Sequence, residues 1–283
     1  MDTISLDNDI ADRTKKYLGT NYNNLRKQKI LVVGAGAVGT EVVKNLVMLG
    51  IETIYLVDFD LVSLSNLNRC VFFRPEHHNT TYKVYAIKHE VEKIWTDSNI
   101  IPFPVSLQEA PDEIWDVPLV IMAVDNNEAR YYANLRILSL ENTPFVINGA
   151  MGKSFVEVQT LYPKETACLL CTWSKEYMDG LFHQMVKETC SQFFEKTVEK
   201  FPSISVLNSL LGSIMVSEAV KILIGKNQWL ETHQWPKEYT PFLGKLWRYD
   251  IQSNEFSLSN LYPNPACVEI SCRCLHKKHN IEN

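Results

Sequence analysis

Short runs of consecutive apolar residues alternate with longer segments of helical spacing along the first half of the chain. The runs have the length of strands and the continuity expected of strands buried on both faces, and they occupy residues 29–33, 53–57, 119–124 and 145–147. The helical segments, with apolar positions three or four apart, occupy residues 38–49, 84–95 and 129–140. Strands that alternate with helices predict a mostly parallel sheet with right-handed crossovers and helices on both faces.

The second half of the chain has a different pattern. Residues 155–162 alternate between apolar and polar side chains, which predicts an antiparallel strand. A long apolar helix is predicted over residues 206–224, ending near Gly225, and a hairpin over residues 246–258. Because no Pro- or Gly-rich linker separates the halves, we expect one α/β fold, a Rossmann-like parallel sheet continued by antiparallel strands. Residues 1–28 are predicted to form a helical arm and residues 29–283 one domain.

Composition narrows the class of protein. The chain has 283 residues, of which 46% are hydrophobic, enough for a large core and too many for a disordered protein. Its 28 basic and 33 acidic residues give a net charge of −5, which argues against binding nucleic acid through a basic face. No apolar run approaches the length of a membrane span, and the N-terminus lacks the pattern of a secretory signal. We expect a cytoplasmic protein with neither nucleic-acid nor membrane partners.

A glycine-rich loop follows the first predicted strand. Gly34, Gly36 and Gly39 form a GxGxxG motif that opens the next helix, where backbone N–H groups and the helix N-terminus attract phosphate oxygens. Asp58 ends the second strand, where a carboxylate would bind ribose hydroxyls. The motif therefore predicts a nucleotide site and, taken alone, a nicotinamide dehydrogenase. A loop whose glycines serve packing alone is the alternative.

The segment at residues 58–69 is not a dehydrogenase feature. It reads DFDLVSLSNLNR and places polar and charged side chains at the carboxyl edge of the sheet, namely Asp58, Asp60, Asn66 and Arg69. Lys83 follows it, and Asp125 ends a central strand. Arginine and lysine together suit a triphosphate, and an aspartate beside them suits Mg²⁺. A solvated charged loop is the alternative for any one of these residues.

Four of the seven cysteines form two close pairs about a hundred residues apart. Cys168 and Cys171 form a CxxC motif, and Cys267 and Cys272 are spaced Cx₄C. This spacing predicts a closed tetrahedral Zn²⁺ site with a structural role, because four thiolates leave no open position. Cys274 lies two residues beyond the second pair and could replace one ligand. Buried free thiols are the alternative.

The sequence resembles the ThiF/MoeB superfamily, which includes the enzymes that activate ubiquitin and ubiquitin-like proteins. The resemblance runs from about Arg13 to Cys272. It is carried by the glycine loop, the D-x-D-x-V-x-x-S-N-L-N-R segment, Lys83, Val124-Asp125-Asn126, the G-x-x-x-x-E-A-x-K pattern in residues 211–221, and the cysteine pairs. The wider spacing of the second pair resembles the ubiquitin-fold-modifier-activating branch.

The resemblance implies an adenylation domain over residues 29–283 that uses ATP and Mg²⁺ and carries a structural zinc subsite near its C-terminus. Asp58 would hold the ribose, with Asp60 in the same nucleotide-binding set, and Asp125 would position Mg²⁺ and the acyl group. The phosphates and the reacting centre would be held by Asn66, Arg69 and Lys83. Arg13 would reach the ATP of a second subunit, which implies a homodimer; the alternative is a surface charge.

Cys190 is the candidate nucleophile, because the superfamily has a cysteine between the first zinc pair and the long helix. In activating enzymes that cysteine takes the acyl group as a thioester, and Lys187 would favour its thiolate. An inert cysteine is the alternative. We expect Cys70 to be a packed thiol, and His77 and His78 to be solvated in a mobile loop before Lys83.

The resemblance therefore implies ATP-dependent adenylation of the C-terminal carboxylate of a small ubiquitin-like protein. Thioester formation at Cys190 and transfer to an acceptor would follow, with a conjugating enzyme as a further partner. The alternative within the superfamily is a sulfur-carrier adenylyltransferase of the thiamin or molybdopterin type, or a peptide- or tRNA-modifying enzyme. A nicotinamide oxidoreductase and a catalytically dead dimerisation partner are the other classes considered.

Overall fold

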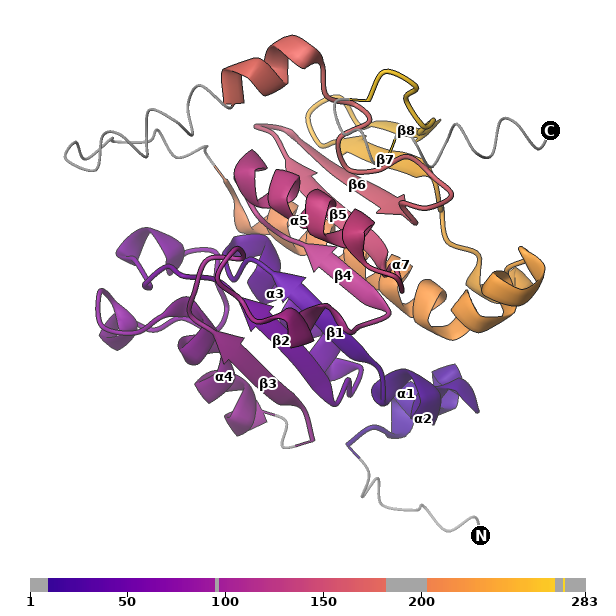
Figure 1. Ribbon diagram of the computed structural model, residues 1–283. Coiled ribbons are helices and arrows are strands. Elements are labelled where there is room, and N and C mark those ends of the chain that lie inside the picture. The colour runs from indigo at the N-terminus through magenta and orange to yellow at the C-terminus, as the bar shows by residue number, and fades with distance from the viewer. Residues whose placement is uncertain (1–9, 95–96, 182–202, 268–271, 273–283) are drawn as a thin grey trace, which may run out of the picture.

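One eight-stranded sheet forms the centre of the protein in the computed structural model (Figure 1). The structure describes residues 10–94, 97–181, 203–267 and 272. The strand order is β3-β2-β1-β4-β5-β6-β7-β8, parallel from β3 to β5 and antiparallel from β5 to β8. The strands are β1 (Lys29–Val33), β2 (Thr53–Val57), β3 (Asn99–Phe103), β4 (Leu119–Met122), β5 (Phe145–Met151), β6 (Phe155–Leu161), β7 (Lys245–Asp250) and β8 (Glu255–Asn260).

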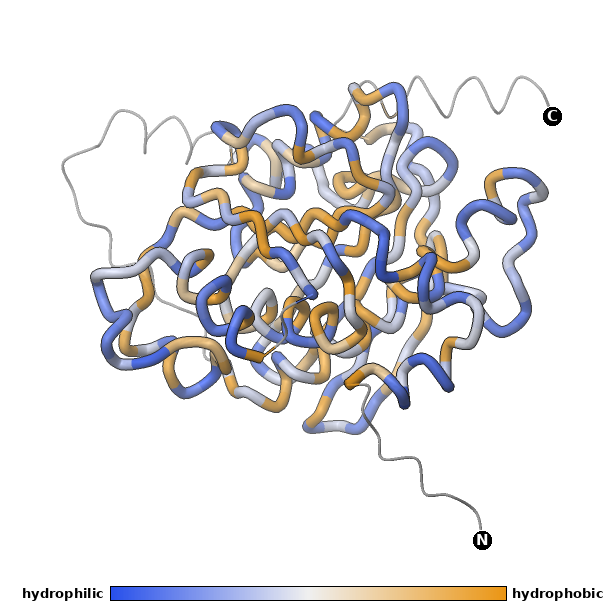
Figure 2. Tube along the Cα trace, turned by 90° about the horizontal axis from the view of Figure 1, so that it is seen from below, coloured by the Kyte–Doolittle hydropathy of each residue, from blue (hydrophilic) through white to orange (hydrophobic). Residues whose placement is uncertain are grey.

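Helices cover both faces of the sheet, as predicted (Figure 1). They are α1 (Asp12–Leu18), α2 (Asn21–Arg26), α3 (Ala37–Met48), α4 (Lys83–Ile94), α5 (Asn127–Ser139) and α7 (Ser205–Thr232), with 3₁₀ turns η1 (Leu64–Asn66) and η2 (Pro75–His77) among the connections. Alternate side chains of β1 show why both faces of the sheet are covered by helices. Ile30 and Val32 pack with α3, α4 and α7, whereas Leu31 and Val33 pack with α5. Figure 2 shows the apolar segments gathered in the interior of the molecule.

The apolar pattern predicts the other strands but not β3. Its sequence Asn-Ile-Ile-Pro-Phe is short, and Pro102 interrupts the run that would mark a strand. β3 lies at the edge of the sheet beside β2, where a residue without an N–H group is tolerated. The helix α4 packs against it.

The long helix α7 extends beyond its predicted end at Gly225 and stops at Thr232. Gly225 is instead a packing site, since a Cβ there would lie 2.7 Å from the Trp235 ring. The expectation that nothing in the chain is long and apolar enough to span a membrane is also wrong, because α7 meets that criterion by length and composition. Its contacts with α3, β5 and β6 are those of a core helix.

Candidate active site and cysteine cluster

The glycine loop connects the end of β1 to the start of α3. Gly34 has φ +99°, and a Cβ there would lie 2.5 Å from the Ala123 carbonyl oxygen, so only glycine fits. Gly39 is equally restricted, because its Cβ would lie 2.0 Å from the Gly34 carbonyl oxygen. Gly36 differs: among the described residues no atom lies within 4 Å of the position its Cβ would take. Open space at the N-terminus of the 12-residue helix α3 is what a bound phosphate requires.

Asp58 fixes this loop from the end of β2. The Ala35 N–H donates to its Oδ2 atom over 2.7 Å, and the Asp60 N–H donates to its Oδ1 atom over 2.9 Å. Burial raises the pKa of the Asp58 carboxyl above its ordinary value, although Lys83 and the two N–H groups act in the opposite direction. The carboxylate therefore organises the loop and the turn at residues 58–60, and it lies at the position predicted for a ribose ligand.

Lys83 begins α4 and lies against both aspartates. Its Nζ atom is 2.5 Å from Asp60 Oδ2 and 3.9 Å from Asp58 Oδ1, and its backbone N–H donates to the Asp60 carbonyl over 2.9 Å. Burial disfavours the charged amine, but the two carboxylates outweigh it and raise the pKa of Lys83. Asp125 contributes to the same effect, which places it in the field of this lysine. The predicted residues of three separate segments thus meet at one edge of the sheet.

The SNLNR segment forms the 3₁₀ turn η1 and the residues that follow it. Asn66 is buried, and its Oδ1 atom accepts hydrogen bonds from the Ser63 N–H at 2.9 Å and the Ser63 hydroxyl at 3.0 Å. Arg69 donates to Asn68 Oδ1 at 3.1 Å and to the Ser65 carbonyl. In this structure both predicted phosphate ligands are therefore bound within their own turn, at the same edge of the sheet as Lys83.

Cys70 is buried next to Arg69 in the sequence, and its thiol is influenced by the charges of Arg69 and Lys83. Burial raises the pKa of its thiol to about 11, although the charges of Arg69 and Lys83 act in the opposite direction. Such a thiol is protonated near neutral pH and is a poor nucleophile. The expectation that Cys70 is a packed thiol is confirmed.

Asp125 lies just beyond β4, and Asn126 caps the following helix α5. The Asn126 Oδ1 atom accepts a hydrogen bond from the Ala129 N–H at 2.7 Å, which fixes the start of the helix beside Asp125. Asp125 is exposed, so its carboxylate oxygens are accessible to a ligand. They are the donor atoms that Mg²⁺ prefers, and Lys83 would supply charge beside it.

Arg130 on α5 was not among the predicted residues, although it supports the same edge. Its buried guanidinium donates to Asn127 Oδ1 (2.7 Å), Asn148 Oδ1 (3.1 Å), the Val124 carbonyl (2.5 Å) and the Gly149 carbonyl (3.0 Å). Burial among neutral acceptors lowers its pKa, and Asp125 partly offsets this. No motif marks Arg130, because its partners come from the residue pair 148–149 of β5, the segment after β4 and the first turn of its own helix.

Two expectations about the surroundings have different outcomes. Arg13 is exposed on α1, which lies beside the start of β1, whereas Asp58 and Asp125 lie beyond the carboxyl ends of β2 and β4 (Figure 1). It therefore does not join the cluster of its own chain.

His77 is buried rather than solvated, and its Nδ1 atom accepts a hydrogen bond from the Arg74 N–H at 3.1 Å; His78 is half-buried. Cys190, Lys187 and Cys274 lie outside the described residues.

The two predicted cysteine pairs come together in one buried cluster. The sulfur of Cys168 lies 3.6 Å from that of Cys171 and 3.8 Å from that of Cys267, and the sulfur of Cys171 lies 3.5 Å from that of Cys272. A tetrahedral Zn²⁺ site with Zn–S bonds of about 2.3 Å separates its sulfurs by about 3.8 Å. The donor set and its spacing thus fit a structural zinc, with no fifth group needed.

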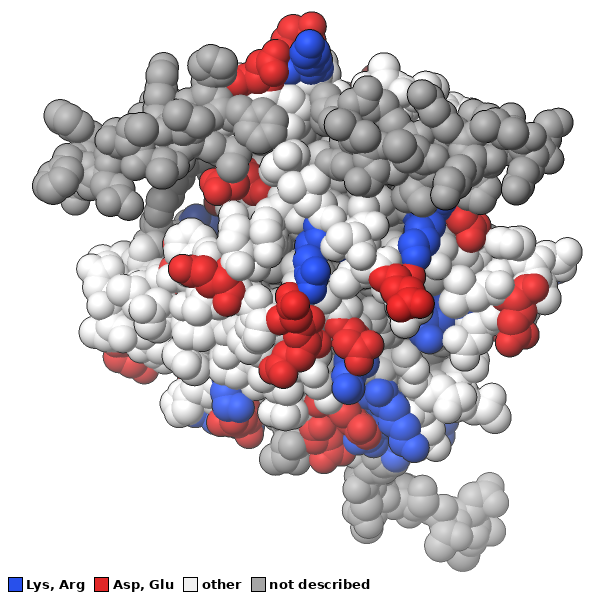
Figure 3. All heavy atoms as spheres, in the orientation of Figure 1, with Lys and Arg blue, Asp and Glu red and all other residues white. Residues whose placement is uncertain are grey.

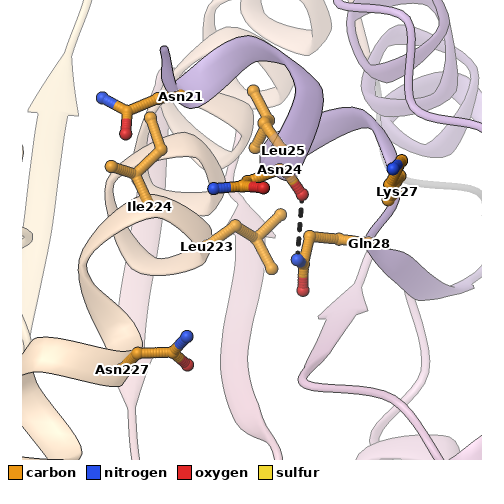
Figure 4. Close-up of a pocket in the computed structure, with 8 residues that line it drawn as sticks. All are labelled: Asn21, Asn24, Leu25, Lys27, Gln28, Leu223, Ile224 and Asn227. Atoms are coloured by element: carbon orange, nitrogen blue, oxygen red, sulfur yellow. Dashed lines mark hydrogen bonds between the residues drawn. The ribbon is translucent and has the colours of Figure 1, made fainter.

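A cavity of about 350 Å³ opens elsewhere, between α2 and α7 (Figure 4). Amide side chains surround an apolar floor in it, and the amides are Asn21, Asn24, Gln28 and Asn227. Its ionisable side chain is Lys27, so it offers no acid–base pair. It also lies beside the start of β1, away from the cluster around Lys83. On the face in Figure 3, acidic and basic side chains are interspersed.

Comparison with known proteins adds the following. A model described as "ThiF family" matches residues 11–269. "Ubiquitin-like modifier-activating enzyme 5" of Arabidopsis thaliana is 26% identical over 271 residues, 89% of this chain and 57% of that protein. "SUMO-activating enzyme subunit 2" of Dictyostelium discoideum is 34% identical over 155 residues, 54% of this chain and 23% of that protein. The chain thus spans little more than half the length of the first of these relatives.

Solved structures share the fold. The crystal structure of E. coli MccB with ATP has a TM-score of 0.70 at 17% identity, covering 94% of this chain and 74% of that one. A structure of the Microcin C7 biosynthetic enzyme MccB with N-formylated MccA has a TM-score of 0.68 at 18% identity, covering 92% of this chain and 74% of that one. At these identities the likeness establishes the architecture alone.

Proposed function

The chain belongs to the ThiF family of E1-like adenylating enzymes, and we propose that it adenylates the C-terminal carboxylate of a small ubiquitin-like protein. The observation that carries the proposal is the meeting of Asp58, Lys83 and Asp125 at the carboxyl edge of the parallel sheet, beside a glycine loop with open space at Gly36. Relatives named as ubiquitin-like-protein-activating enzymes support the choice of substrate class.

The chemistry follows from the charges at this edge. The substrate carboxylate forms a bond to the α-phosphorus of ATP as the bond from that phosphorus to the bridging oxygen breaks, and pyrophosphate leaves with the electron pair. Lys83 and Arg69 would neutralise charge that spreads over the phosphate oxygens, a contribution of about 3 kcal/mol for each well-placed donor. Mg²⁺, when bound, would screen the same oxygens, and Asp125 is the side chain placed to hold it.

Part of the site is already arranged for this reaction, whereas Arg69 must leave the Ser65 carbonyl and Asn68 to reach a phosphate. Asp58 already holds the glycine loop through Ala35, so the backbone N–H groups at the start of α3 are oriented before a nucleotide arrives. Lys83 must exchange Asp60 for a phosphate, an exchange of one anionic partner for another. Alignment and electrostatic stabilisation therefore account for the catalysis, with no covalent group required for the first step.

Pyrophosphate exchange tests the proposal. Asp125→Ala should abolish exchange of labelled pyrophosphate into ATP in the presence of a ubiquitin-like substrate, while the thermal unfolding curve stays unchanged. Asp116→Ala is the matched control, because Asp116 is an exposed aspartate just before β4 rather than after it. Normal exchange in Asp125→Ala would remove Asp125 from the mechanism. Hydride transfer to NAD without pyrophosphate release would replace the proposal with an oxidoreductase.

The acceptor of the acyl group is a separate part of the proposal. Transfer to Cys190 would release AMP and leave a thioester, from which a conjugating enzyme could take the acyl group. Cys190→Ala should then retain pyrophosphate exchange and lose a covalent adduct that hydroxylamine removes and a reductant leaves intact. An adduct that persists in this variant would place the nucleophile at another residue.

A second copy of the chain would complete the nucleotide site. Arg13 lies away from the cluster of its own chain, so its proposed contact with ATP requires a homodimer. In mixtures of Arg13→Ala and Asp125→Ala subunits, one site of each mixed dimer would regain both residues, and exchange should reappear. Failure of the mixture to restore exchange would leave Arg13 as a surface charge.

A peptide rather than a ubiquitin-like protein is the second candidate substrate. MccB, whose fold this chain shares, has been solved with N-formylated MccA, which is the reason to test a peptide beside a ubiquitin-like protein. Exchange stimulated by a short peptide, and no stimulation by a ubiquitin-like protein, would decide for this alternative. It keeps every residue role proposed above for the adenylation step.

A further inference from the structure

The outer edge of β8 is an open end of the sheet. β8 follows β7 through a tight turn and pairs with it over residues 245–250 and 255–260, and all six residues of β8 are exposed. Among the described residues, no strand pairs with its other side. This edge therefore presents N–H and C=O groups that a further strand could bind.

The opposite edge of the sheet, formed by β3, is protected against pairing with a further strand, whereas the β8 edge is not. β3 contains Pro102, which lacks an N–H group, and the helix α4 packs against the strand. Prolines, inward-facing charges and covering elements are the usual protections of an edge strand. β8 has neither proline nor lysine, and its one charged residue, Glu255, stands at its first position.

The side chains of β8 differ on its two faces. Phe256 pairs with Tyr249, and Leu258 pairs with Trp247, so these four side chains share the face of the sheet that α7 covers further along. Phe256 and Leu258 are 60% and 43% exposed, although the Phe256 ring lies 5.9 Å from that of Trp247. The other face carries Ser257. The edge thus combines backbone groups that pair with no described strand and apolar side chains on one face.

We propose that the occupant of this edge is β8 of a second copy of the chain, paired antiparallel across a two-fold axis through Ser257. A two-fold axis perpendicular to the sheet keeps the faces of both copies aligned, so only residues of the same face oppose each other. With the axis at Ser257, Phe256 of one copy faces Leu258 of the other, and this aromatic–aliphatic pair occurs twice.

The same register also satisfies the charges and the polar face. Glu255 faces Ser259 of the second copy, and Asn254 faces Asn260, so no like charges oppose each other. Ser257 faces Ser257 of the second copy, where two small hydroxyl groups fit. The strand is therefore complementary to itself in sequence as well as in backbone. It is a short contact, so the dimer should depend on protein concentration.

This interface is separate from the homodimer proposed through Arg13. α1 and β8 are well separated in the molecule (Figure 1), so each contact could form without the other. The edge pairing would join two sheets into one and leave the nucleotide edge of each copy open. It does not rest on the adenylation activity.

A cysteine pair across the proposed axis tests the register. Ser257→Cys would place two introduced thiols next to each other at the axis, so a short thiol crosslinker should give a covalent dimer. The crosslinker must be shorter than the length of four strand residues. Ser259→Cys is the matched control, because the two introduced thiols would then lie about 13 Å apart along the strands. Wild-type protein reports the background from its native cysteines. Equal crosslinking of the two variants, or none above wild type, would overturn the proposal.

Sedimentation of the chain without added thiols gives an independent readout. Leu258→Lys would place a lysine opposite Phe256 in both apolar pairs. It should raise the dissociation constant of the dimer about tenfold or more. Leu230→Lys, an exposed leucine on α7, is the control and should leave association unchanged. Identical sedimentation of Leu258→Lys and wild type over a range of concentrations would refute a second copy as the occupant.

Discussion

At the scale of single residues, the sequence predicts which side chains meet better than it predicts what they bind. Asp58 and Asp125 follow β2 and β4, the two parallel strands on either side of β1, so their convergence follows from the topology. The topology does not predict the hydrogen-bond partners of these side chains. Asp58 accepts two backbone N–H groups, and Asn66 uses its amide oxygen within its own turn. These partners depend on loop geometry, which periodicity does not encode. Arg130 escapes prediction for the same reason.

The pair formed by Asp60 and Lys83 gives a pH-dependent prediction. Their contact helps to raise the pKa of Lys83, so the amine stays charged to a higher pH than burial alone would allow. In Asp60→Asn the pKa of Lys83 should fall, and the alkaline limb of the exchange rate against pH should move to lower pH. Asp60→Glu keeps the charge and should restore the wild-type profile. An alkaline limb that does not move in Asp60→Asn would contradict the role of Asp60 in positioning and charging Lys83.

Arg130 gives a prediction about stability. Arg130→Lys retains the charge but cannot reach all four acceptors, so buried carbonyl and amide oxygens lose their donors. The free energy of unfolding in urea should fall by about 2–4 kcal/mol. Arg136→Lys on the same helix is the control, because Arg136 pairs with exposed Asp112 and should change stability by less than about 1 kcal/mol. Equal effects would show that the buried network contributes nothing specific.

At the scale of whole elements, periodicity succeeds where one physical effect dominates. The continuous apolar runs of β1 and β4 reflect burial on both faces, and the alternation in β6 reflects a strand with one buried face. β3 is missed because Pro102 is tolerated at an edge, and the predicted end of α7 fails because Gly225 serves packing. His77 was expected to be solvated because it was assigned to a mobile loop, whereas it ends the 3₁₀ turn η2 and accepts the Arg74 N–H.

The crossing of α3 and α7 depends on one glycine. A Cβ on Gly212 would lie 2.7 Å from the Cβ of Glu41 and 3.2 Å from the backbone nitrogen of Val42, so the two helices would have to move apart. Gly212→Ala should lower the free energy of unfolding by about 1–3 kcal/mol, despite the higher helix propensity of alanine. Gly180→Ala, where no described atom lies within 4 Å, should not destabilise the protein. A stable Gly212→Ala variant would mean that the crossing adapts without cost.

At the scale of the whole molecule, the cysteine cluster joins the segments that follow β6 and β8, two strands that β7 separates in the sheet. Cys168 and Cys171 follow β6, whereas Cys267 and Cys272 come after β8. The Leu261 N–H donates to the Gly244 carbonyl, and Asn264 Nδ2 donates to the Cys171 carbonyl, so the segment after β8 is fixed beside the CxxC motif. The nucleotide edge lies at the other end of the sheet order and is built from β1, β2 and β4.

This separation predicts that zinc removal and nucleotide binding are only weakly coupled. Chelation would remove the bond between the two cysteine pairs and should cost several kcal/mol of stability, a fall in melting temperature of about 10 °C. Hydrogen exchange should accelerate first in β7 and β8, while ATP affinity changes little. Cys267→Ser should reproduce the loss and make the protein insensitive to chelator, whereas Cys70→Ser, outside the cluster, should still respond to it. An unchanged melting curve in metal-free protein would contradict a structural zinc, because four buried thiols that need no ion would then account for the cluster.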